Sequence, residues 1–336
     1  MEKRSLKVVS EAWPLRSPFA ISGYTFTAMQ FVLVKVEHSG QVGSGEAAGV
    51  YYHGDTPERL VHQVESVRKS IEDGISREAL QSLLPPGGAR NAIDCALWDL
   101  EAKLTSRPAW QLAGMAPPKP LLTTFTCGAA DPREMATVAK SYKGSRAIKL
   151  KLTGHPEDAD RIRAVREARP DVWLSVDANQ GFTRSLLERL MPVFVEQNVA
   201  LVEQPFPVGQ EHELDGLDSP IPIAADESIQ GVADLESLVG RFSVVNIKLD
   251  KCGGLTEALV IAREARSRGL KVMIGNMLGT SLAMAPAFLV GQFCDVVDLD
   301  GPVFLQRDRE CSVQYSDGYI TCPPDVWGSP LDRPHV

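Results

Sequence analysis

The first part of the chain alternates apolar and polar residues as β-strands do. Residues 31–37 (FVLVKVE) alternate, residues 38–40 (HSG) favour a turn, and residues 41–46 resume the alternation. Two such runs joined by a short turn that contains glycine are typical of an antiparallel hairpin. The chain is therefore predicted to begin as β-structure up to residue 46.

The hydrophobic spacing then changes to that of amphipathic helices. Residues 57–73 follow Thr56, whose hydroxyl suits a helix N-cap. Residues 89–104 place apolar side chains three and four positions apart, so these share one helical face. Strands followed by helices predict an α+β domain over residues 1–114, which closes just before the Pro-Pro pair at 117–118.

From residue 121 onward, short apolar segments alternate with amphipathic ones. This repeat predicts an α/β fold, a modified (β/α)8 barrel of the TIM type over residues 115–303, with seven clear helices and the α+β domain as its cap. The turn-rich segment 304–336 is expected to pack back on the cap. An open doubly wound sheet is the alternative, although no G-x-G-x-x-G motif follows the first strand. The expected barrel strands are 121–126, 147–151, 172–176, 200–202, 221–224, 244–248, 271–274 and 296–299.

Composition narrows the class of protein further. The net charge of −8 argues against nucleic-acid binding, which needs an excess of lysine and arginine. No segment approaches the ~20 apolar residues that cross a bilayer, and the charged start MEKRSLKVVSEAWP lacks the apolar core of a signal peptide. The six cysteines are scattered, which favours free thiols over disulfides or a zinc site. We therefore expect a cytoplasmic protein without a membrane partner, and possible assembly into a homo-oligomer.

Five ionisable residues follow successive predicted strands at nearly equal intervals. Their separations are 26, 26, 23 and 22 residues, close to one strand–helix repeat. Because the carboxyl ends of barrel strands open onto one mouth, all five side chains are expected to face a common centre. A single carboxylate after a strand often only caps the next helix, but five in succession are harder to explain in that way. They are Lys151, Asp177, Glu203, Asp226 and Lys248.

These residue types indicate a specific chemistry. Three carboxylates without histidine or cysteine make an oxygen site that favours Mg²⁺. The two lysines come from strands on either side of the carboxylates, so a substrate carbon could lie between them. Proton removal beside a carboxylate creates an enediolate, whose charge needs roughly 10 kcal/mol or more of stabilisation for useful rates. Two bases on opposite faces favour a racemase or epimerase over a lyase.

At these residues the chain resembles the enolase superfamily, in its muconate-lactonizing-enzyme subgroup. The resemblance covers GSGEAA and ARNAIDCALWDLEAK in the cap, the K-x-K of 149–151, the three carboxylates, and NIKLDKCGGLTEA. It implies Mg²⁺ bound by the carboxylates and an acid/base pair of Lys151 and Lys248. It further implies that Lys149 is an electrostatic helper, that Lys251 is secondary, and that two side chains support the metal ligands. Those two are Asn179 and Glu227.

The sequence DLDGP after the eighth predicted strand narrows the substrate. Asp298 and Asp300 are two positions apart, so they point the same way on a strand and form a concentrated negative patch. In dipeptide epimerases, which the chain resembles most, such a D-x-D pair binds the α-ammonium of the substrate. Thr126 resembles a threonine of those enzymes that touches the dipeptide backbone. A solvated acidic pair and a locally bonded hydroxyl are the plain alternatives.

One departure from that resemblance concerns the second residue of the dipeptide. Relatives acting on L-Ala-L-Glu carry an arginine in the loop that corresponds to residues 21–26, where this chain has ISGYTF with Tyr24 and Phe26. Arg16 lies upstream and is a possible substitute. A buried glutamate side chain without a cation is poorly compensated, so an apolar or small second residue is expected. A second lid is expected at 49–55, which contains Tyr51, Tyr52 and His53, the last as a plain polar loop residue.

The sequence therefore predicts a Mg²⁺-dependent epimerase that inverts the α-carbon of the C-terminal residue of a dipeptide. An N-acylamino acid racemase, an o-succinylbenzoate synthase or a muconate cycloisomerase with the same site is the alternative. A barrel that binds a ligand without catalysis is more remote, since every expected position is filled.

Overall fold

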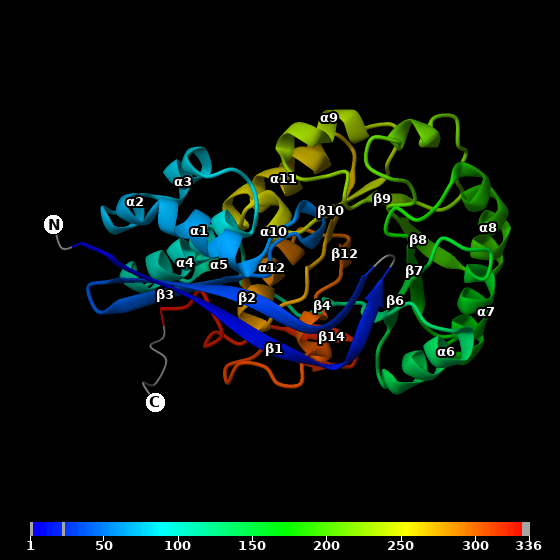
Figure 1. Cartoon of the computed structure of the whole chain (residues 1–336), viewed down its shortest axis with the longest axis horizontal. Helices are drawn as coiled ribbons and strands as arrows, with labels where there is room; N and C mark the ends of the chain where they lie inside the picture. The colour runs from blue at the N-terminus through cyan, green and yellow to red at the C-terminus, as the bar shows by residue number, and fades with distance from the viewer. Residues whose placement is uncertain (1–2, 22–23, 331–336) are drawn as a thin grey trace.

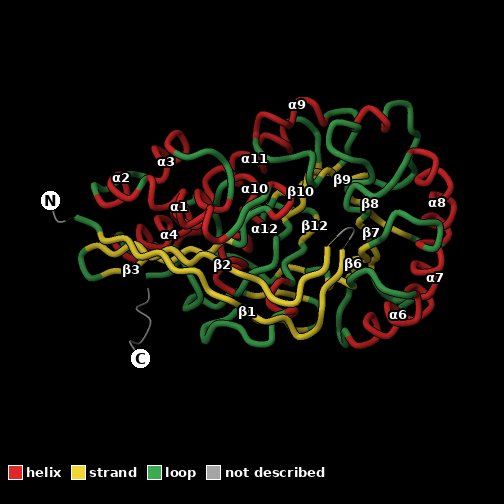
Figure 2. Tube along the Cα trace, in the orientation of Figure 1, coloured by secondary structure: helices red, strands yellow, loops and turns green. Residues whose placement is uncertain are grey.

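The computed structural model describes residues 3–21 and 24–330. The cyan helices of the amino-terminal part lie at one end of the molecule, the green barrel elements lie at the other, and the yellow to orange elements lie between them (Figure 1). Strands β1 (Ser5–Ile21), β2 (Tyr24–His38) and β3 (Gln41–Ala47) form an antiparallel sheet in that order. The predicted hairpin is therefore confirmed, and its tight turn has positive φ at Ser39 and Gly40. Figure 2 shows that β1 and β2 continue as a long ribbon toward the barrel.

The cap helices pack on this sheet. Thr56 caps α1 (Pro57–Ser66) as predicted, its hydroxyl accepting from Arg59 N at 3.2 Å. The prediction of one continuous helix over 57–73 is wrong, because the backbone leaves helical geometry at Val67 and α2 (Arg68–Glu72) starts anew. This bend lets the side chain of Val67 remain buried in the same apolar cluster as those on α1 and α2. A further helix, α3 (Arg77–Leu83), was not predicted.

Helix α4 (Gly88–Leu104) lies directly against β3. A Cβ at Gly43 would come within 2.1 Å of Ala96 O, and one at Gly45 within 2.1 Å of Ala92 O. Only glycine lets a helix backbone approach a strand so closely. The GSG of the cap motif is therefore explained by packing. Helix α4 is followed by the short helix α5 (Ala109–Leu112).

Eight parallel strands form the second sheet, in the order β12-β11-β10-β9-β8-β7-β6-β5. The two edge strands of this sheet meet where Thr124 N donates to Val297 O at 3.0 Å. The sheet therefore closes into a barrel, and the open doubly wound alternative is excluded. The strands are β5 (Phe125–Cys127), β6 (Ala147–Lys151), β7 (Trp173–Asp177), β8 (Val199–Glu203), β9 (Ile223–Ala225), β10 (Val244–Ile247), β11 (Lys271–Ile274) and β12 (Val296–Val297).

Helices do not follow every strand. The described barrel contains seven α-helices, α6 to α12, but they are unevenly distributed. Strand β8 is followed only by the 3-10 turn η2 (Glu211–Leu214), and β9 by the 3-10 turn η3 (Val232–Asp234) and the four-residue α9 (Leu235–Leu238). The β8–β9 connection is rich in proline and glycine, which interrupt helices. The other barrel helices are α6 (Pro132–Ser141), α7 (Asp158–Ala168), α8 (Arg184–Glu196), α10 (Leu249–Cys252), α11 (Leu255–Ser267) and α12 (Ser281–Gly291).

The expected first barrel strand, 121–126, is divided between two sheets. Its first part is β4 (Leu121–Leu122), which pairs with β14 (Tyr319–Thr321) and, through it, β13 (Gln314–Ser316). The strand is interrupted at Thr123. Its N–H donates to Gly318 O and its hydroxyl accepts from Leu299 N, and neither hydrogen bond belongs to the barrel ladder. Only the continuation, β5, joins the barrel.

The carboxyl-terminal segment touches the cap at several points. Leu305 pairs with Leu15 of β1 after the 3-10 turn η4 (Gly301–Phe304). Further along, Trp327 Nε1 donates to Ser44 O at 2.9 Å. Residues 331–336 of the segment that was expected to pack on the cap lie outside the described residues.

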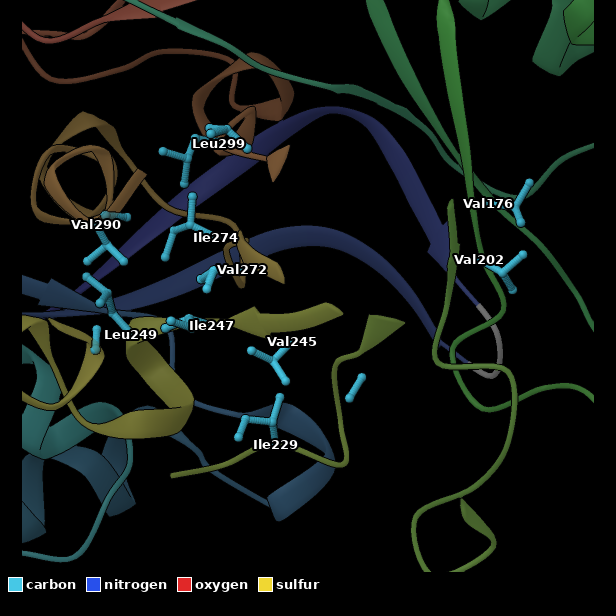
Figure 3. Packing of buried hydrophobic residues seen from close by; sticks show 14 of the residues in the cluster. Val176, Val202, Ile229, Val245, Ile247, Leu249, Val272, Ile274, Val290 and Leu299 are labelled. Carbon is cyan, nitrogen blue, oxygen red and sulfur yellow. The ribbon is translucent and has the colours of Figure 1, made fainter. Parts of the chain in front are cut away.

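Apolar side chains fill both sides of the barrel wall. Ile274 of β11 and Val290 of α12 belong to the large cluster between strands and helices (Figure 3). Leu201, Val244 and Met273 form a separate cluster with Ala224, drawn from four adjacent strands. Burying each large apolar side chain stabilises the fold by ~1.5–3 kcal/mol. Among the described residues, none of the helices has the length and apolar character needed to span a membrane.

Candidate active site

The inner cluster of the barrel shows which strand positions face its axis. Side chains two apart on a strand point the same way, so Leu201 predicts that Glu203 also faces inward, and Val244 predicts the same for Asn246 and Lys248. All of these inward polar side chains are buried. Strands β8 and β10 thus carry apolar residues at the bottom of the barrel and polar ones toward or just beyond their carboxyl ends.

The three carboxylates expected to bind a metal converge. One oxygen each of Asp177, Glu203 and Asp226 lies within 4.8 Å of the others, and all three residues are at most 1% exposed. Burial and the nearby Asp177 raise the pKa of Glu203 to about 8. Glu203 Oε2 forms an ion pair with Lys149 Nζ at 2.8 Å. Three converging carboxylates without histidine or cysteine form an all-oxygen ligand set, which fits a hard divalent cation such as Mg²⁺.

Among the described residues, four lysines contact these carboxylates, and two of them are the predicted acid/base pair. Lys151 Nζ lies 2.6 Å from Asp177 Oδ2, at the end of β6, and Lys248 Nζ lies 2.6 Å from Asp226 Oδ2, just after β10. Since β7, β8 and β9 lie between them in the sheet order, the two lysines approach from opposite sides. Burial alone would lower the pKa of Lys248, but the carboxylate of Asp226 raises it above the usual value.

Lys149 stands between the carboxylates and the acidic pair after β12. Its Nζ contacts Asp177 Oδ2 and Asp298 Oδ2 at 3.0 Å each, besides Glu203. Burial opposes its charge, yet these carboxylates together raise its pKa well above the usual value. Lys149 is therefore a fixed cation in this structure and links the two acidic groups.

Two side chains that the sequence reasoning missed also hold the carboxylates. Asn246 Nδ2 donates to Glu203 Oε1 at 2.9 Å. Gln204 Oε1 accepts from Asp226 N at 2.8 Å, which fixes the start of the following loop. The inward position of Asn246, two residues before Lys248, was a usable signal. Gln204 has no such signal, because it follows Glu203 and faces away by strand alternation.

Lys251 and the two expected supporting residues lie beside the same cluster. Lys251 Nζ contacts Asp226 Oδ1 at 2.6 Å, and burial lowers its pKa. Asn179 N donates to Asp177 Oδ1 at 2.9 Å, and Asn179 Nδ2 donates to Glu227 Oε1 at 3.4 Å. Glu227 Oε2 has no hydrogen-bond partner among the described residues, and burial raises the pKa of this carboxyl to about 7. Glu227 thus retains an unused acceptor and is one of the residues that line the cavity.

The acidic pair lies on the far side of Lys149. Asp298 accepts from the Thr124 hydroxyl at 2.5 Å as well as from Lys149. Asp300 Oδ2 accepts from Thr126 N at 2.7 Å. Burial and the neighbouring Asp298 raise the pKa of Asp300 to about 7. Asp300 has no ion-pair partner among the described residues, so a cationic group would find an uncompensated carboxylate here.

Comparison with known proteins places this arrangement in a family. Residues 3–114 match the mandelate racemase/muconate lactonizing enzyme N-terminal domain, and residues 133–327 match the enolase C-terminal domain-like family. The chain belongs to the enolase superfamily. Among its relatives, the L-Ala-D/L-Glu epimerase of Escherichia coli is 39% identical over 94% of this chain and 99% of that protein. An N-acetyl-D-glutamate racemase of a Pseudoalteromonas species is 40% identical over 74% of this chain and 79% of that protein.

Solved structures of enolase-superfamily proteins agree with this assignment. One from Agrobacterium tumefaciens, with homology to dipeptide epimerases and with bound sodium and L-Ala-L-Glu, has a TM-score of 0.94 at 39% identity, covering 97% of this chain and all of that one. The dipeptide epimerase of Enterococcus faecalis, complexed with Mg and L-Leu-L-Tyr, has a TM-score of 0.89 at 29% identity, covering 96% and 98%. The relatives are epimerases and racemases, so this member of the superfamily is an isomerase.

Aromatic side chains form one wall of the cavity that contains the lysines and the acidic pair. Tyr51, in η1 (Tyr51–His53), packs edge-on against Tyr24 and Phe26 of β2 with ring centroids 4.6 and 5.5 Å apart. Phe26, Tyr51 and Tyr52 line the same cavity as the lysines. His53 does not line it, and burial lowers the pKa of its imidazole. The cavity has a volume of about 60 Å³.

The described lining of this cavity contains lysines but no arginine. Arg16 instead lines a neighbouring cavity, where its Nε donates to Leu305 O at 2.7 Å. Of the loop residues compared with the relatives' arginine-bearing loop, 22 and 23 lie outside the described residues.

Proposed function

We propose that this isomerase is a Mg²⁺-dependent dipeptide epimerase that inverts the α-carbon of the C-terminal residue. The observation that carries the proposal is the placement of Asp300 and Asp298 in the cavity that also contains Lys151 and Lys248. A dipeptide presents both groups that this cavity complements, a carboxylate for the metal side and an α-ammonium for the acidic side. Its relative from Escherichia coli is a dipeptide epimerase.

Asp177, Glu203 and Asp226 would hold the metal. A divalent cation held there would supply electrostatic stabilisation of the negative charge that develops on the substrate carboxylate when the α-proton leaves. The chain's own part is to keep these carboxylates fixed, through Asn246 on Glu203 and Lys251 on Asp226. The Mg bound to the Enterococcus faecalis dipeptide epimerase supports this choice of metal.

The two lysines would move the proton. One takes the α-proton from one face of the substrate, and the lysine opposite returns a proton to the other face, which inverts the configuration. Their positions after β6 and β10 provide the two faces. Lys149 holds its charge between the carboxylates and Asp298, so it stabilises negative charge without exchanging its own proton. Thr126 fixes Asp300 through its N–H.

The side chain of the second residue would meet Phe26 and Tyr51, while Tyr24, which is 47% exposed and outside the described lining of the cavity, packs against Tyr51. These rings offer apolar surface, and Phe26 and Tyr51 both line the substrate cavity. A glutamate side chain would have no guanidinium partner among the described residues of that cavity, and burying an unpaired carboxylate is costly. We therefore assign a preference for an apolar or small second residue.

The alternative keeps the site and changes the substrate to an N-acylamino acid, as in the Pseudoalteromonas racemase, or to that of an o-succinylbenzoate synthase or muconate cycloisomerase. Such substrates lack an ammonium group for Asp298 and Asp300, which would then remain buried acids without a cation from the ligand. A barrel that only binds its ligand would not need two lysines placed on opposite sides of the carboxylates.

Deuterium uptake tests the proposal. The protein is incubated in D₂O with Mg²⁺ and pooled L,L-dipeptides, and mass spectrometry reports which gain one deuteron. Dipeptides with apolar second residues should be labelled, and added EDTA should stop the labelling. Uptake by N-acylamino acids but not by dipeptides would favour the alternative, while Asp298→Asn and Asp300→Asn should then leave the rate unchanged. Labelling that continues in EDTA would exclude the metal.

A further inference from the structure

A second cavity adjoins the substrate cavity on the side of the acidic pair. It has a volume of about 720 Å³, and Phe19, Thr126 and Phe304 line both cavities. Sites for small molecules usually enclose ~300–1,000 Å³. The substrate cavity, at about 60 Å³, is below that range, whereas the second cavity lies within it. A bound dipeptide therefore needs space beyond the first cavity.

The acidic pair determines which end of a dipeptide would meet this space. Thr126 N donates to Asp300, and Thr126 is one of the residues shared by the two cavities. An α-ammonium held by Asp300 would lie at the junction. The carbon that bears this ammonium also bears the side chain of the first residue, so that side chain has direct access to the second cavity.

The walls of the second cavity are suited to apolar groups. The Tyr142 hydroxyl donates to Thr126 O at 2.8 Å and the Tyr315 hydroxyl to Leu299 O at 2.6 Å, so both tyrosines present mainly their rings. Val138 and Val313 add aliphatic surface. The cavity therefore resembles a site for a large apolar side chain.

The charged residues around this cavity are already bonded or exposed. Asp308 accepts from Ser281 N at 2.9 Å and from Arg309 N at 2.7 Å, and Arg16 donates to Leu305 O. Glu134, on α6, is exposed to solvent. The described lining thus holds no buried carboxylate that requires a cationic side chain.

An aromatic pair separates the two cavities. The rings of Phe19, on β1, and Phe304, at the end of η4, have centroids 4.7 Å apart and contribute to both linings. Strand β1 belongs to the cap, and η4 follows the last barrel strand. The width of the opening between the two cavities therefore depends on how the cap packs against the barrel.

We propose that the second cavity is the subsite for the side chain of the first residue, and that it selects dipeptides whose first residue is large and apolar. This inference rests on the proposed function, because it takes the α-ammonium to bind at Asp300. It assigns the first residue, whereas Phe26 and Tyr51 were assigned to the second. The preferred substrate is thus apolar at both positions.

Two dipeptides that differ only in the first residue test this subsite. L-Phe-L-Leu and L-Ala-L-Leu present the same reacting carbon, so the ratio of their kcat/KM values reports the first side chain alone. In the unmodified protein this ratio should favour L-Phe-L-Leu by roughly tenfold, as expected for burial of a phenyl ring. Equal values for the two dipeptides would overturn the subsite.

Variants that fill the cavity sharpen the test. Val138→Trp places a large ring in the cavity, and Ser141→Trp does so from an exposed position on the same helix, where folding is less at risk. Either change should lower the ratio by roughly tenfold, chiefly through KM for L-Phe-L-Leu. Val195→Trp, on α8 at a half-exposed position, is the matched control and should keep the ratio. A parallel loss for both dipeptides would overturn the subsite alone, and absence of labelling with any dipeptide would overturn the proposed function with it.

Discussion

Asp250 Oδ1 accepts a hydrogen bond from Gly49 N at 2.8 Å, which joins the cap to the barrel beside a catalytic candidate. Asp250 is buried and lies two residues after Lys248, and Gly49 begins the lid that carries Tyr51 and Tyr52. Gly49 has a φ of +76°, a conformation that favours glycine. This hydrogen bond therefore fixes the base of the lid to the segment that carries Lys248, so the position of the Tyr51 and Tyr52 rings is coupled to that of the lysine.

Asp250→Ala should release the lid. Loss of the acceptor leaves a buried N–H unpaired, which lowers the free energy of unfolding by about 1–3 kcal/mol. It should also raise KM for the dipeptide about tenfold while kcat changes less, since lid contacts form on binding. Urea denaturation and steady-state kinetics measure the two effects. The control is Asp73→Ala, an aspartate with 46% side-chain exposure; a similar rise of KM in that variant would contradict the assignment.

Each lysine should serve one epimer. Because Lys151 and Lys248 approach from opposite sides, replacing either by alanine should reduce epimerisation by at least ~10²–10⁴-fold. The remaining lysine should still exchange the α-hydrogen of one epimer without inverting it. Separate D₂O incubations of L,L and L,D substrates, read by mass spectrometry, would show this. Lys143→Ala, at an exposed position, is the control. Loss of exchange from the same epimer in both lysine variants would contradict the two-sided arrangement.

Gly275→Ala should disturb Lys248 without touching the substrate cavity directly. A Cβ at this position would lie 2.8 Å from Asn246 Oδ1 and 3.1 Å from Lys248 Cε. The two side chains must shift, so kcat should fall at least tenfold with a smaller change in KM, as misplacement of reacting groups by about 1 Å costs ~10²-fold. Gly231→Ala is the matched control, since its Cβ would meet nothing closer than 3.8 Å. An unchanged kcat would show that the lysine tolerates displacement.

Dipeptide binding should strengthen as the pH rises through 7. Burial and Asp298 raise the pKa of Asp300 to about 7, so in the free protein this carboxyl is protonated below that pH. An ammonium group pairs with the ionised form, hence binding must displace the proton and KM should fall by up to about tenfold per pH unit below pH 7. Above ~8 the substrate amine itself deprotonates and KM should rise again. In Asp300→Asn the fall of KM between pH 5 and 7 should disappear. If KM still fell in this variant, another group would be responsible for the pH dependence.

Phe26→Arg should introduce preference for an acidic second residue. Phe26 lines the substrate cavity next to Tyr51, and a guanidinium at this position can pair with a carboxylate in two hydrogen bonds. The kcat/KM ratio of L-Ala-L-Glu to L-Ala-L-Leu should rise at least tenfold, consistent with a charged hydrogen bond of ~1.5–3 kcal/mol. Phe26→Met tests for loss of the ring alone. A ratio that rises equally with methionine would exclude the charge pair as the cause.

The sequence by itself determined the repeat of strands and helices and the ionisable residues at the carboxyl ends of five successive strands. Both are local patterns: the apolar runs give the strands, and the period of two decides which side chains accompany Leu201 or Val244 toward the axis. For that reason Lys151, Asp177, Glu203, Asp226 and Lys248 could be assigned to one mouth before their distances were known. A helix break such as the one at Val67 could not be predicted in this way, because the local apolar pattern continues through it.

Only the tertiary structure decided which groups touch across large sequence separations. Asp250 and Gly49 are 201 residues apart, and Lys149 and Asp298 are 149 apart. Their contacts depend on how the cap seats on the barrel and how the barrel closes at Thr124 and Val297. The second cavity is formed by β1, α6 and the segment after β12, none of which predicts a cavity alone. A hydrophobic pattern specifies that a face is buried, whereas the shape left between buried faces arises only when distant segments pack together.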